Sequence, residues 1–135
     1  MAQQPALEHV NMTVSDPDRT AQILTELFGW TIRWSGSSQL GGRSIHVGVP
    51  GNGTGYVALY AAGETKAPTE STYVSRGGLN HIGVVVDDIY LIEERVANAG
   101  YKPHMHGQDE PGRSYFYFDD HDGIEFEVVS YEARD

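Results

Sequence analysis

Apolar and polar residues alternate along two short segments that resemble each other. Residues 7–14 read LEHVNMTV and residues 79–86 read LNHIGVVV, so that an apolar side chain recurs at every second position in both. This is the period of a β-strand with one buried face. His9 and His81 occupy the same place in the two segments. The match predicts an internal repeat in which each half of the chain begins with the same strand.

A helix is predicted after each of these strands. In both halves a short polar residue suited to the N-cap precedes apolar residues at helical spacing, and a glycine suited to the helix end follows them. The glycine lies 20 positions after His9 in the first half and 19 after His81 in the second. The candidate caps and end residues are Ser15 or Asp16 with Gly29, and Asp87 or Asp88 with Gly100.

Three further strands complete each half. They are predicted at 30–34, 43–50 and 56–60, with a glycine-rich turn at 51–55, and again at 102–106, 114–118 and 124–129. Each half then reads βαβββ. Together they predict an α+β fold in which two tandem modules form a curved mixed sheet around a cleft, with the helices on its outer face.

The expected boundaries follow from composition. Module one covers about 5–62 and module two about 78–132, while Gly, Pro, Ser and Thr are frequent in the linker at about 63–77. One module by itself exposes half a core. The pair is therefore expected to fold as a single domain, 1–135.

Strand alternation separates an apolar face from a polar face in each module. Val10, Met12 and Val14 point away from His9 and Asn11. We expect the apolar face to lie under the helices and the polar face to line a cavity. The candidate substrate-binding residues on the polar face are Asn11, Tyr56, Ala58, Tyr60 and Tyr115.

His9 and His81 would face one space if the polar faces of the two modules pack together. In the last strand of module two, Glu127 and Glu125 share this face, whereas Ala58 holds the place of Glu127 in module one. Two imidazoles and one carboxylate hold a divalent first-row metal and leave positions open for substrate and for oxygen or water. A lone strand histidine is more often structural. Its recurrence at a matching place favours metal binding.

The other histidines carry weaker signals. His46 faces the cavity side of its strand by alternation and could act as a base, while a structural role is equally open. His104 and His106 are expected to share one face of their strand. His121 lies in an acidic turn, where we expect it to be solvated.

The composition favours a small-molecule ligand. The chain has 135 residues, a net charge of −10 and 39% hydrophobic residues, which fits one globular domain. The acidic balance opposes binding to nucleic acids and to anionic membranes. There is no cysteine, which excludes disulfides and thiolate ligands. No leader or membrane-spanning segment is expected, which favours a cytoplasmic protein. Open sheet edges favour a homodimer.

The βαβββ repeat with its two histidines and its glutamate resembles the vicinal oxygen chelate superfamily, which includes glyoxalase I, type I extradiol dioxygenases, fosfomycin-modifying enzymes and bleomycin-resistance proteins. The most specific matches are residues 7–14, 79–88 and 114–127. In the last of these, the family's Asp-Pro-x-Gly turn appears at 120–123 with His121 in place of the proline. The resemblance implies that Glu127, rather than Glu125, is the third ligand.

Within that superfamily the resemblance is greatest to the extradiol-type dioxygenases. Ala58 disfavours the glyoxalase and epimerase types, which use four protein ligands. The extradiol type implies that Tyr117, together with His46 or His106, moves protons. It also implies Fe(II) as the ion, with Mn, Zn or Ni as alternatives.

Two other interpretations stay open. A glyoxalase-like isomerase or a fosfomycin-type thiol transferase would use the same metal as a Lewis acid. The transferase needs a basic anion pocket, for which the strand register places neither Arg113 nor Arg134 well. A metal-free, bleomycin-resistance-like protein would bind a small molecule with the fold alone.

Overall fold

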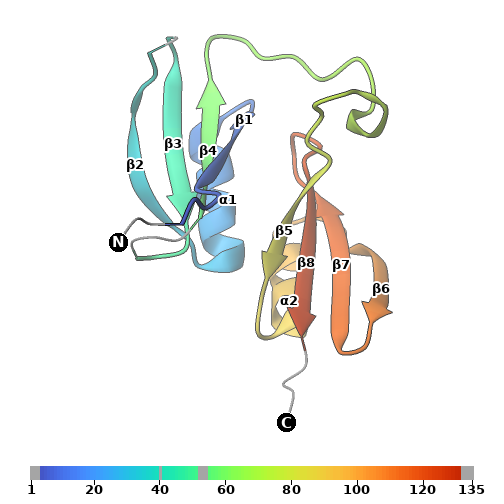
Figure 1. The fold of residues 1–135 in the computed structure, drawn as a ribbon. Coiled ribbons are helices and arrows are strands. Elements are labelled where there is room, and N and C mark those ends of the chain that lie inside the picture. The colour runs from blue at the N-terminus through green and yellow to red at the C-terminus, as the bar shows by residue number, and fades with distance from the viewer. Residues whose placement is uncertain (1–3, 40, 52–54, 132–135) are drawn as a thin grey trace. The chain divides into compact units, whose positions relative to one another are not determined.

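The chain forms two compact units, Met1–Lys66 and Ala67–Asp135, and each has the same order of elements (Figure 1). The structure, a computed structural model, describes residues 4–39, 41–51 and 55–131. Within these residues each unit consists of one α-helix and a sheet of four strands in the order βαβββ. The predicted α+β class and the tandem repeat of two βαβββ modules are confirmed.

The first unit places its first strand beside its last. Its sheet has the order β1-β4-β3-β2, in which β1 pairs with β4 in parallel and the other pairs are antiparallel. Residues 52–54 of the expected glycine-rich turn lie outside the described residues. The elements are β1 (His9–Thr13), α1 (Pro17–Phe28), β2 (Thr31–Ser37), β3 (Arg43–Gly48) and β4 (Tyr56–Ala61).

The second unit repeats this topology. Its sheet has the order β5-β8-β7-β6, again with one parallel pair, β5 and β8. A short 3-10 helix, η1 (Thr72–Val74), precedes the sheet within the segment that sequence composition assigns to a linker. The other elements are β5 (His81–Val85), α2 (Ile89–Asn98), β6 (His104–Glu110), β7 (Arg113–Asp119) and β8 (Glu125–Tyr131).

Both helices start at the later of their two candidate caps. The Asp16 carboxylate accepts hydrogen bonds from two backbone N–H groups of the first turn of α1, and the Asp88 carboxylate accepts one from α2. These bonds satisfy donors that have no partner inside the helix. Gly29, with φ of 71°, ends α1, and Gly100, with φ of 93°, follows the last residues of α2. Positive φ favours glycine at both places.

Each helix covers one face of its own sheet. Helix α1 packs against β3 and β4, and α2 packs against β7 and β8. The buried side chains on this face include Leu24, Leu27, Ile45 and Leu59 in the first unit, and Val96, Phe116, Phe118 and Phe126 in the second. Val14 is buried, as strand alternation predicts, and the opposite face of each sheet carries the polar residues considered below. Among the described residues, no helix is long and apolar enough to cross a membrane.

Candidate metal and substrate site

The pairing of the parallel strands shows which positions of the two units correspond. His9 is paired with Tyr56, and His81 is paired with Glu125. Two residues further along the last strands come Ala58 and Glu127. The predicted equivalence is therefore confirmed: Ala58, only 2% exposed, stands in the first unit where Glu127 stands in the second.

His81 and Glu127 face each other in the second unit. Their atoms Nε2 and Oε2 are 3.2 Å apart. Glu127 is 8% exposed, so its carboxylate needs strong partners. Its other oxygen, Oε1, accepts a hydrogen bond of 2.7 Å from the Arg113 guanidinium.

Arg113 is held from three sides. It donates to both Asp109 oxygens at 2.9 Å and to the Tyr131 hydroxyl at 3.1 Å, besides Glu127. The hydrogen bonds to Tyr131, Glu127 and Asp109 raise the pKa of Arg113 above its usual value. That register leaves Arg113 poorly placed for an anion pocket stays a prediction. Its long side chain reaches from the start of β7 back to Glu127, so that two carboxylates contact the guanidinium. Arg134 lies outside the described residues.

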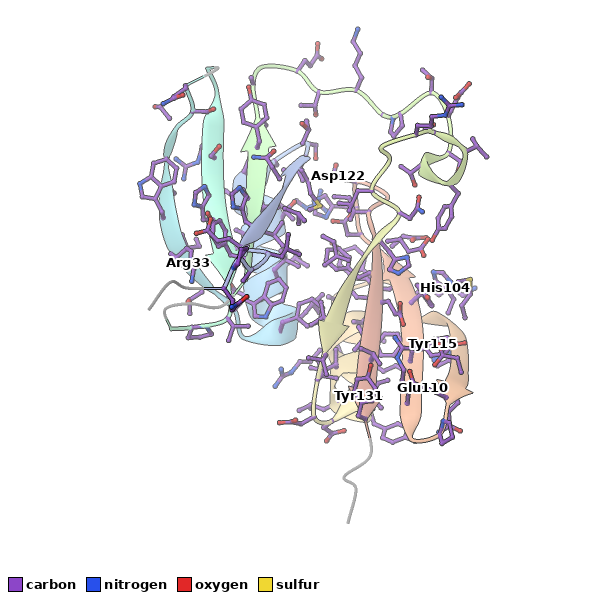
Figure 2. The ribbon with its side chains drawn as sticks, viewed as in Figure 1. Arg33, His104, Glu110, Tyr115, Asp122 and Tyr131 are labelled. Atoms are coloured by element: carbon purple, nitrogen blue, oxygen red, sulfur yellow. The ribbon has the colours of Figure 1, made fainter. Side chains whose placement is uncertain are left out.

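Tyr117 completes the surroundings of Glu127. It is paired with Glu127 across β7 and β8, and its ring meets the His81 ring edge-on at 5.5 Å. Burial, followed by the hydrogen bond to Glu127, raises the pKa of Tyr117 to about 12. Tyr115, labelled in Figure 2, lies against the Tyr117 ring at 5.8 Å. Near neutral pH, Tyr117 is therefore a protonated phenol and a donor.

Tyr73 and Glu125 contact the other side of the His81 ring. The Tyr73 hydroxyl donates to Glu125 Oε1 at 2.8 Å and lies 3.3 Å from His81 Nδ1. The hydrogen bond to Glu125 raises the pKa of Tyr73. Tyr73 is not among the residues predicted for the site, because it belongs to η1, in the segment predicted to be a linker, where the sequence has no strand or helix period.

A cavity of about 500 Å³ borders this tyrosine. Its walls come from the segment that precedes β5 and from the ends of β7 and β8. The lining residues are Pro68, Thr69, Glu70, Ser71, Thr72, Tyr73, Asn80, Asp119, Gly123 and Glu125.

His9 has a similar environment in the first unit. Its Nδ1 lies 2.8 Å from Glu8 Oε1, and the same oxygen accepts a hydrogen bond of 3.0 Å from the Tyr56 hydroxyl. The rings of His9 and Tyr56 stack at 4.9 Å. Both predicted histidine ligands thus turn Nδ1 toward a tyrosine and glutamate pair.

Aromatic rings continue across this face of the first unit. The His46 ring lies 4.8 Å from Tyr56 and 5.0 Å from Trp34. Burial, and then the charge of His9, lowers the pKa of His46. Arg33, labelled in Figure 2, lies at a register shift in β2 and places its guanidinium 4.5 Å from the Tyr56 ring. The remaining candidate substrate residues are Asn11, which is exposed opposite Ala58, and Tyr60, which is half-buried.

His104 and His106 do not share a face, so this expectation is wrong. His104, labelled in Figure 2, lies 3.7 Å from Asp119. His106 contacts Glu93 of α2 and stacks on the buried Phe116, on the helix side of the sheet. The strand changes register between His104 and Gly107, and the intervening Met105 has φ of 53°. The proposed proton-transfer role of His106 stays a prediction.

The expectation that His121 is solvated is also wrong. Its side chain is only 8% exposed, and its Nδ1 lies 2.9 Å from the Tyr101 hydroxyl. The neighbouring Asp120 carboxylate accepts backbone hydrogen bonds from Asp122 and Ile124, which fold this turn inward. His121 therefore has a structural contact in the turn that precedes β8.

The three predicted metal ligands come from both units. Glu127 and His81 approach each other within the second unit, whereas His9 belongs to the first. Among the described residues there is no group of three or more His, Asp or Glu side chains that could hold a metal ion. The three-ligand set stays a prediction. Two of its members, His81 and Glu127, lie side by side in the second unit.

Known families and folds match almost the whole chain. The model of the glyoxalase/bleomycin resistance protein/dioxygenase superfamily matches residues 6–128. A domain described by the same three names, from Frankia sp. EAN1pec, is 25% identical with a TM-score of 0.75, over 96% of this chain and 100% of that one. A comparison with curated proteins gives no match.

Two fosfomycin resistance proteins share the fold. FosX from Listeria monocytogenes, solved with Mn(II) and sulfate, is 19% identical with a TM-score of 0.69, over 96% of this chain and 95% of that one. FosX from Mesorhizobium loti is 23% identical with a TM-score of 0.67 and the same coverage, 96% and 95%. At these identities the likeness shows the fold alone.

Proposed function

This chain belongs to the glyoxalase/bleomycin resistance protein/dioxygenase superfamily, and from that premise we propose that it is a divalent-metal enzyme. Its substrate is a small molecule that chelates the ion through two vicinal oxygens, and the reaction is most like extradiol ring cleavage. His9, His81 and Glu127 would hold the ion. The observation that carries the proposal is the approach of His81 Nε2 to Glu127 Oε2.

The distance between these two atoms fits a shared ion. Nitrogen and oxygen ligands lie about 2.0–2.2 Å from a first-row metal, so two ligands at right angles are about 3 Å apart. Nε2 and Oε2 are 3.2 Å apart. Arg113 and Tyr117 bind Glu127 from outside, as partners of metal-bound carboxylates do.

Ala58 favours oxygen chemistry within this proposal. A methyl group at the place equivalent to Glu127 supplies no fourth protein ligand. A bound ion would supply open positions for two substrate oxygens and a third small ligand. We propose Fe(II) as that ion, and the Mn(II) in the Listeria FosX structure supports a divalent ion in general.

The chain's own residues supply the proton transfers. Tyr117 is a protonated phenol near neutral pH, and in this proposal it turns its one proton from Glu127 to a substrate oxyanion. His46 has a lowered pKa, so its neutral ring accepts a proton from a substrate hydroxyl. Arg113 holds Glu127 in place through its hydrogen bond to Oε1.

The test combines metal content with oxygen uptake. Protein reconstituted with Fe(II) is expected to hold one ion per chain and to consume oxygen with at least one member of a catechol panel. Glu127→Ala should lose the ion, while Glu125→Ala should retain it with weaker affinity. A wild-type protein that binds neither Fe(II) nor Mn(II) contradicts the proposal and favours a metal-free binding protein.

Arg33 supports a second candidate, a fosfomycin-type thiol transferase. Its guanidinium lies over the Tyr56 ring, on the same face as His9. The register shift between Ile32 and Trp34 lies at this residue. Such a cation suits an anionic substrate. Thiol consumption with an epoxide phosphonate, together with no oxygen uptake on catechols, would favour this reaction.

Assembly as a homodimer is part of the same proposal. The end strands β2 and β6 each pair on one side only within the described sheets, and such edges invite pairing with a second copy. Light scattering at micromolar concentration should give twice the chain mass. A monomer mass would contradict this part.

A further inference from the structure

We propose that Tyr73 and Glu125 form a hydrogen-bonded pair that holds the neutral His81 ring as its Nδ1–H tautomer and turns the Nε2 lone pair toward Glu127. Tyr73 is thus a positioning residue for a ligand, in a segment that its composition marks as a linker. The effect of Tyr73 on metal affinity rests on the proposed function, in which His81 is a metal ligand.

The protons around the Tyr73 hydroxyl favour the Nδ1–H tautomer, in competition with the Nε2–H form that a hydrogen bond to Glu127 Oε2 would favour. A phenol has one proton to donate, and Tyr73 donates it to Glu125 Oε1 at 2.8 Å. The same hydroxyl oxygen lies 3.3 Å from His81 Nδ1. Only a proton on Nδ1 can complete that second hydrogen bond. Glu125 Oε1, itself 3.6 Å from Nδ1, favours the proton at the same place.

The opposite side of the ring then presents a lone pair. Nε2 lies 3.2 Å from Glu127 Oε2, and the guanidinium of Arg113 donates a hydrogen bond to the other oxygen of that carboxylate. Two electron-pair donors in this position repel each other unless a cation lies beside both. The Nδ1–H tautomer is thus the form of the neutral ring that suits a bound ion.

The first unit contains an equivalent pair built from different positions. Glu8 contacts His9 Nδ1 directly at 2.8 Å and accepts a hydrogen bond from Tyr56. Tyr56 corresponds in register to Glu125, whereas Glu8 precedes His9 directly and Tyr73 comes from η1, so the two pairs are built from partly different places. The repeat by itself does not dictate this pairing. Its presence beside both histidines therefore supports the same role, holding the Nδ1 side of the ring, in each unit.

Local hydrogen bonds hold Tyr73 in place. The Ser71 hydroxyl accepts a bond from the Tyr73 backbone N–H at 3.2 Å, and the Ser75 hydroxyl donates to the Ser71 carbonyl at 2.9 Å. Gly78 packs closely behind the turn, because a Cβ there would lie 2.6 Å from the Thr72 carbonyl oxygen. This turn ends three residues before His81.

The direct test is nitrogen-15 NMR of the histidine rings in metal-free protein. The spectra are recorded at about pH 8.5, above the ordinary histidine pKa of about 6.5, because only a neutral ring reports a tautomer. Wild type should show Nδ1–H at His81, and a wild-type ring that is mainly Nε2–H, bonded to Glu127, would overturn the proposal. Tyr73→Phe should shift His81 toward Nε2–H, and Tyr90→Phe, at a tyrosine that is 80% exposed on α2, should leave it unchanged.

Mn(II) titration measures the consequence. Tyr73→Phe is expected to weaken binding about 10–100-fold relative to wild type and to Tyr90→Phe, the usual effect of losing an outer partner of a metal ligand. Glu125→Ala should act in the same direction, because Tyr73 then donates its proton to Nδ1.

The two readouts separate the two proposals. An unchanged Nδ1–H tautomer in both Tyr73→Phe and Glu125→Ala overturns the positioning role, whatever the metal data show. Failure of wild type to bind Mn(II) overturns the proposed metal site, while the tautomer in metal-free protein still decides the role of Tyr73.

Discussion

The polar faces of the two units share one topology and differ in chemistry. In the first unit, Ala58 and stacked rings occupy the sheet face beside His9. In the second, a buried carboxylate, Glu127, occupies the place equivalent to Ala58 and is bound by Arg113. The repeat therefore preserves the positions of the two histidines, while the residues that surround each histidine differ between the units.

The two units also differ in how deeply an ion pair is buried. The ion pair of Arg113 with Glu127 is buried in the second unit, with side chains that are 16% and 10% exposed. In the first unit, Arg43 and Asp18 form an ion pair whose side chains are 49% and 65% exposed. Breaking the first should matter for stability far more than breaking the second.

The largest expected effect comes from making the two units alike. Ala58→Glu places a second carboxylate at the equivalent position, where it would supply a fourth ligand. We expect Mn(II) binding to be kept or tightened and oxygen uptake on catechols to be abolished. Retention of full oxygen uptake in the loaded variant would show that Ala58 does not mark an open position.

The second prediction compares the two ion pairs by urea unfolding. Arg113→Ala should lower the free energy of unfolding by about 2 kcal/mol, because Glu127 loses a charged hydrogen bond in a largely buried place. Arg43→Ala should lower it by about 0.5 kcal/mol or less. Equal effects of the two variants would contradict the contrast between the buried and the exposed ion pair.

A third comparison concerns the tyrosines at high pH. The pKa of Tyr117 is raised to about 12, so folding favours its protonated form. This contribution to stability is complete below the ordinary tyrosine pKa of about 10 and is lost as pH rises toward 12. Tyr117→Phe should therefore lose less stability than wild type over that range. If the free energy of unfolding falls equally in wild type and in Tyr117→Phe over this range, the pKa of Tyr117 is not raised by its burial.

The smallest effect concerns His46. Burial and the charge of His9 lower its pKa, and Arg33 lowers it further. Arg33→Ala should raise the pKa of His46 slightly, while it stays below the ordinary histidine value. An NMR titration of the ring protons measures this change, with Arg43→Ala as the matched arginine control. If the pKa of His46 rose more in Arg33→Ala than in His9→Ala, Arg33 and not His9 would be the stronger of the two charges that lower it.

Much of the fold could be predicted because it depends on local periods. Strand alternation places Val14 in the core and His9 on the opposite face, and short polar residues followed by glycine mark both helices. The equivalence of Ala58 and Glu127 follows from the same repeat. These features require no knowledge of long-range contacts.

The partners of Glu127 and His81 depend on contacts that a period does not encode. Arg113 shares its strand parity with Tyr115 and Tyr117, which could have indicated its face, but its reach depends on a long side chain. Tyr73 comes from a turn with no period at all. His106 changes face because the strand shifts register beside Met105.

We propose that one divalent ion binds histidines from both units together with Glu127. Pulsed electron paramagnetic resonance of Mn(II)-loaded protein with nitrogen-15 histidine counts the imidazole nitrogens bound to the ion. We predict two in wild type, one in His9→Ala and one in His81→Ala. A single coupled nitrogen that persists unchanged in His9→Ala would contradict the claim.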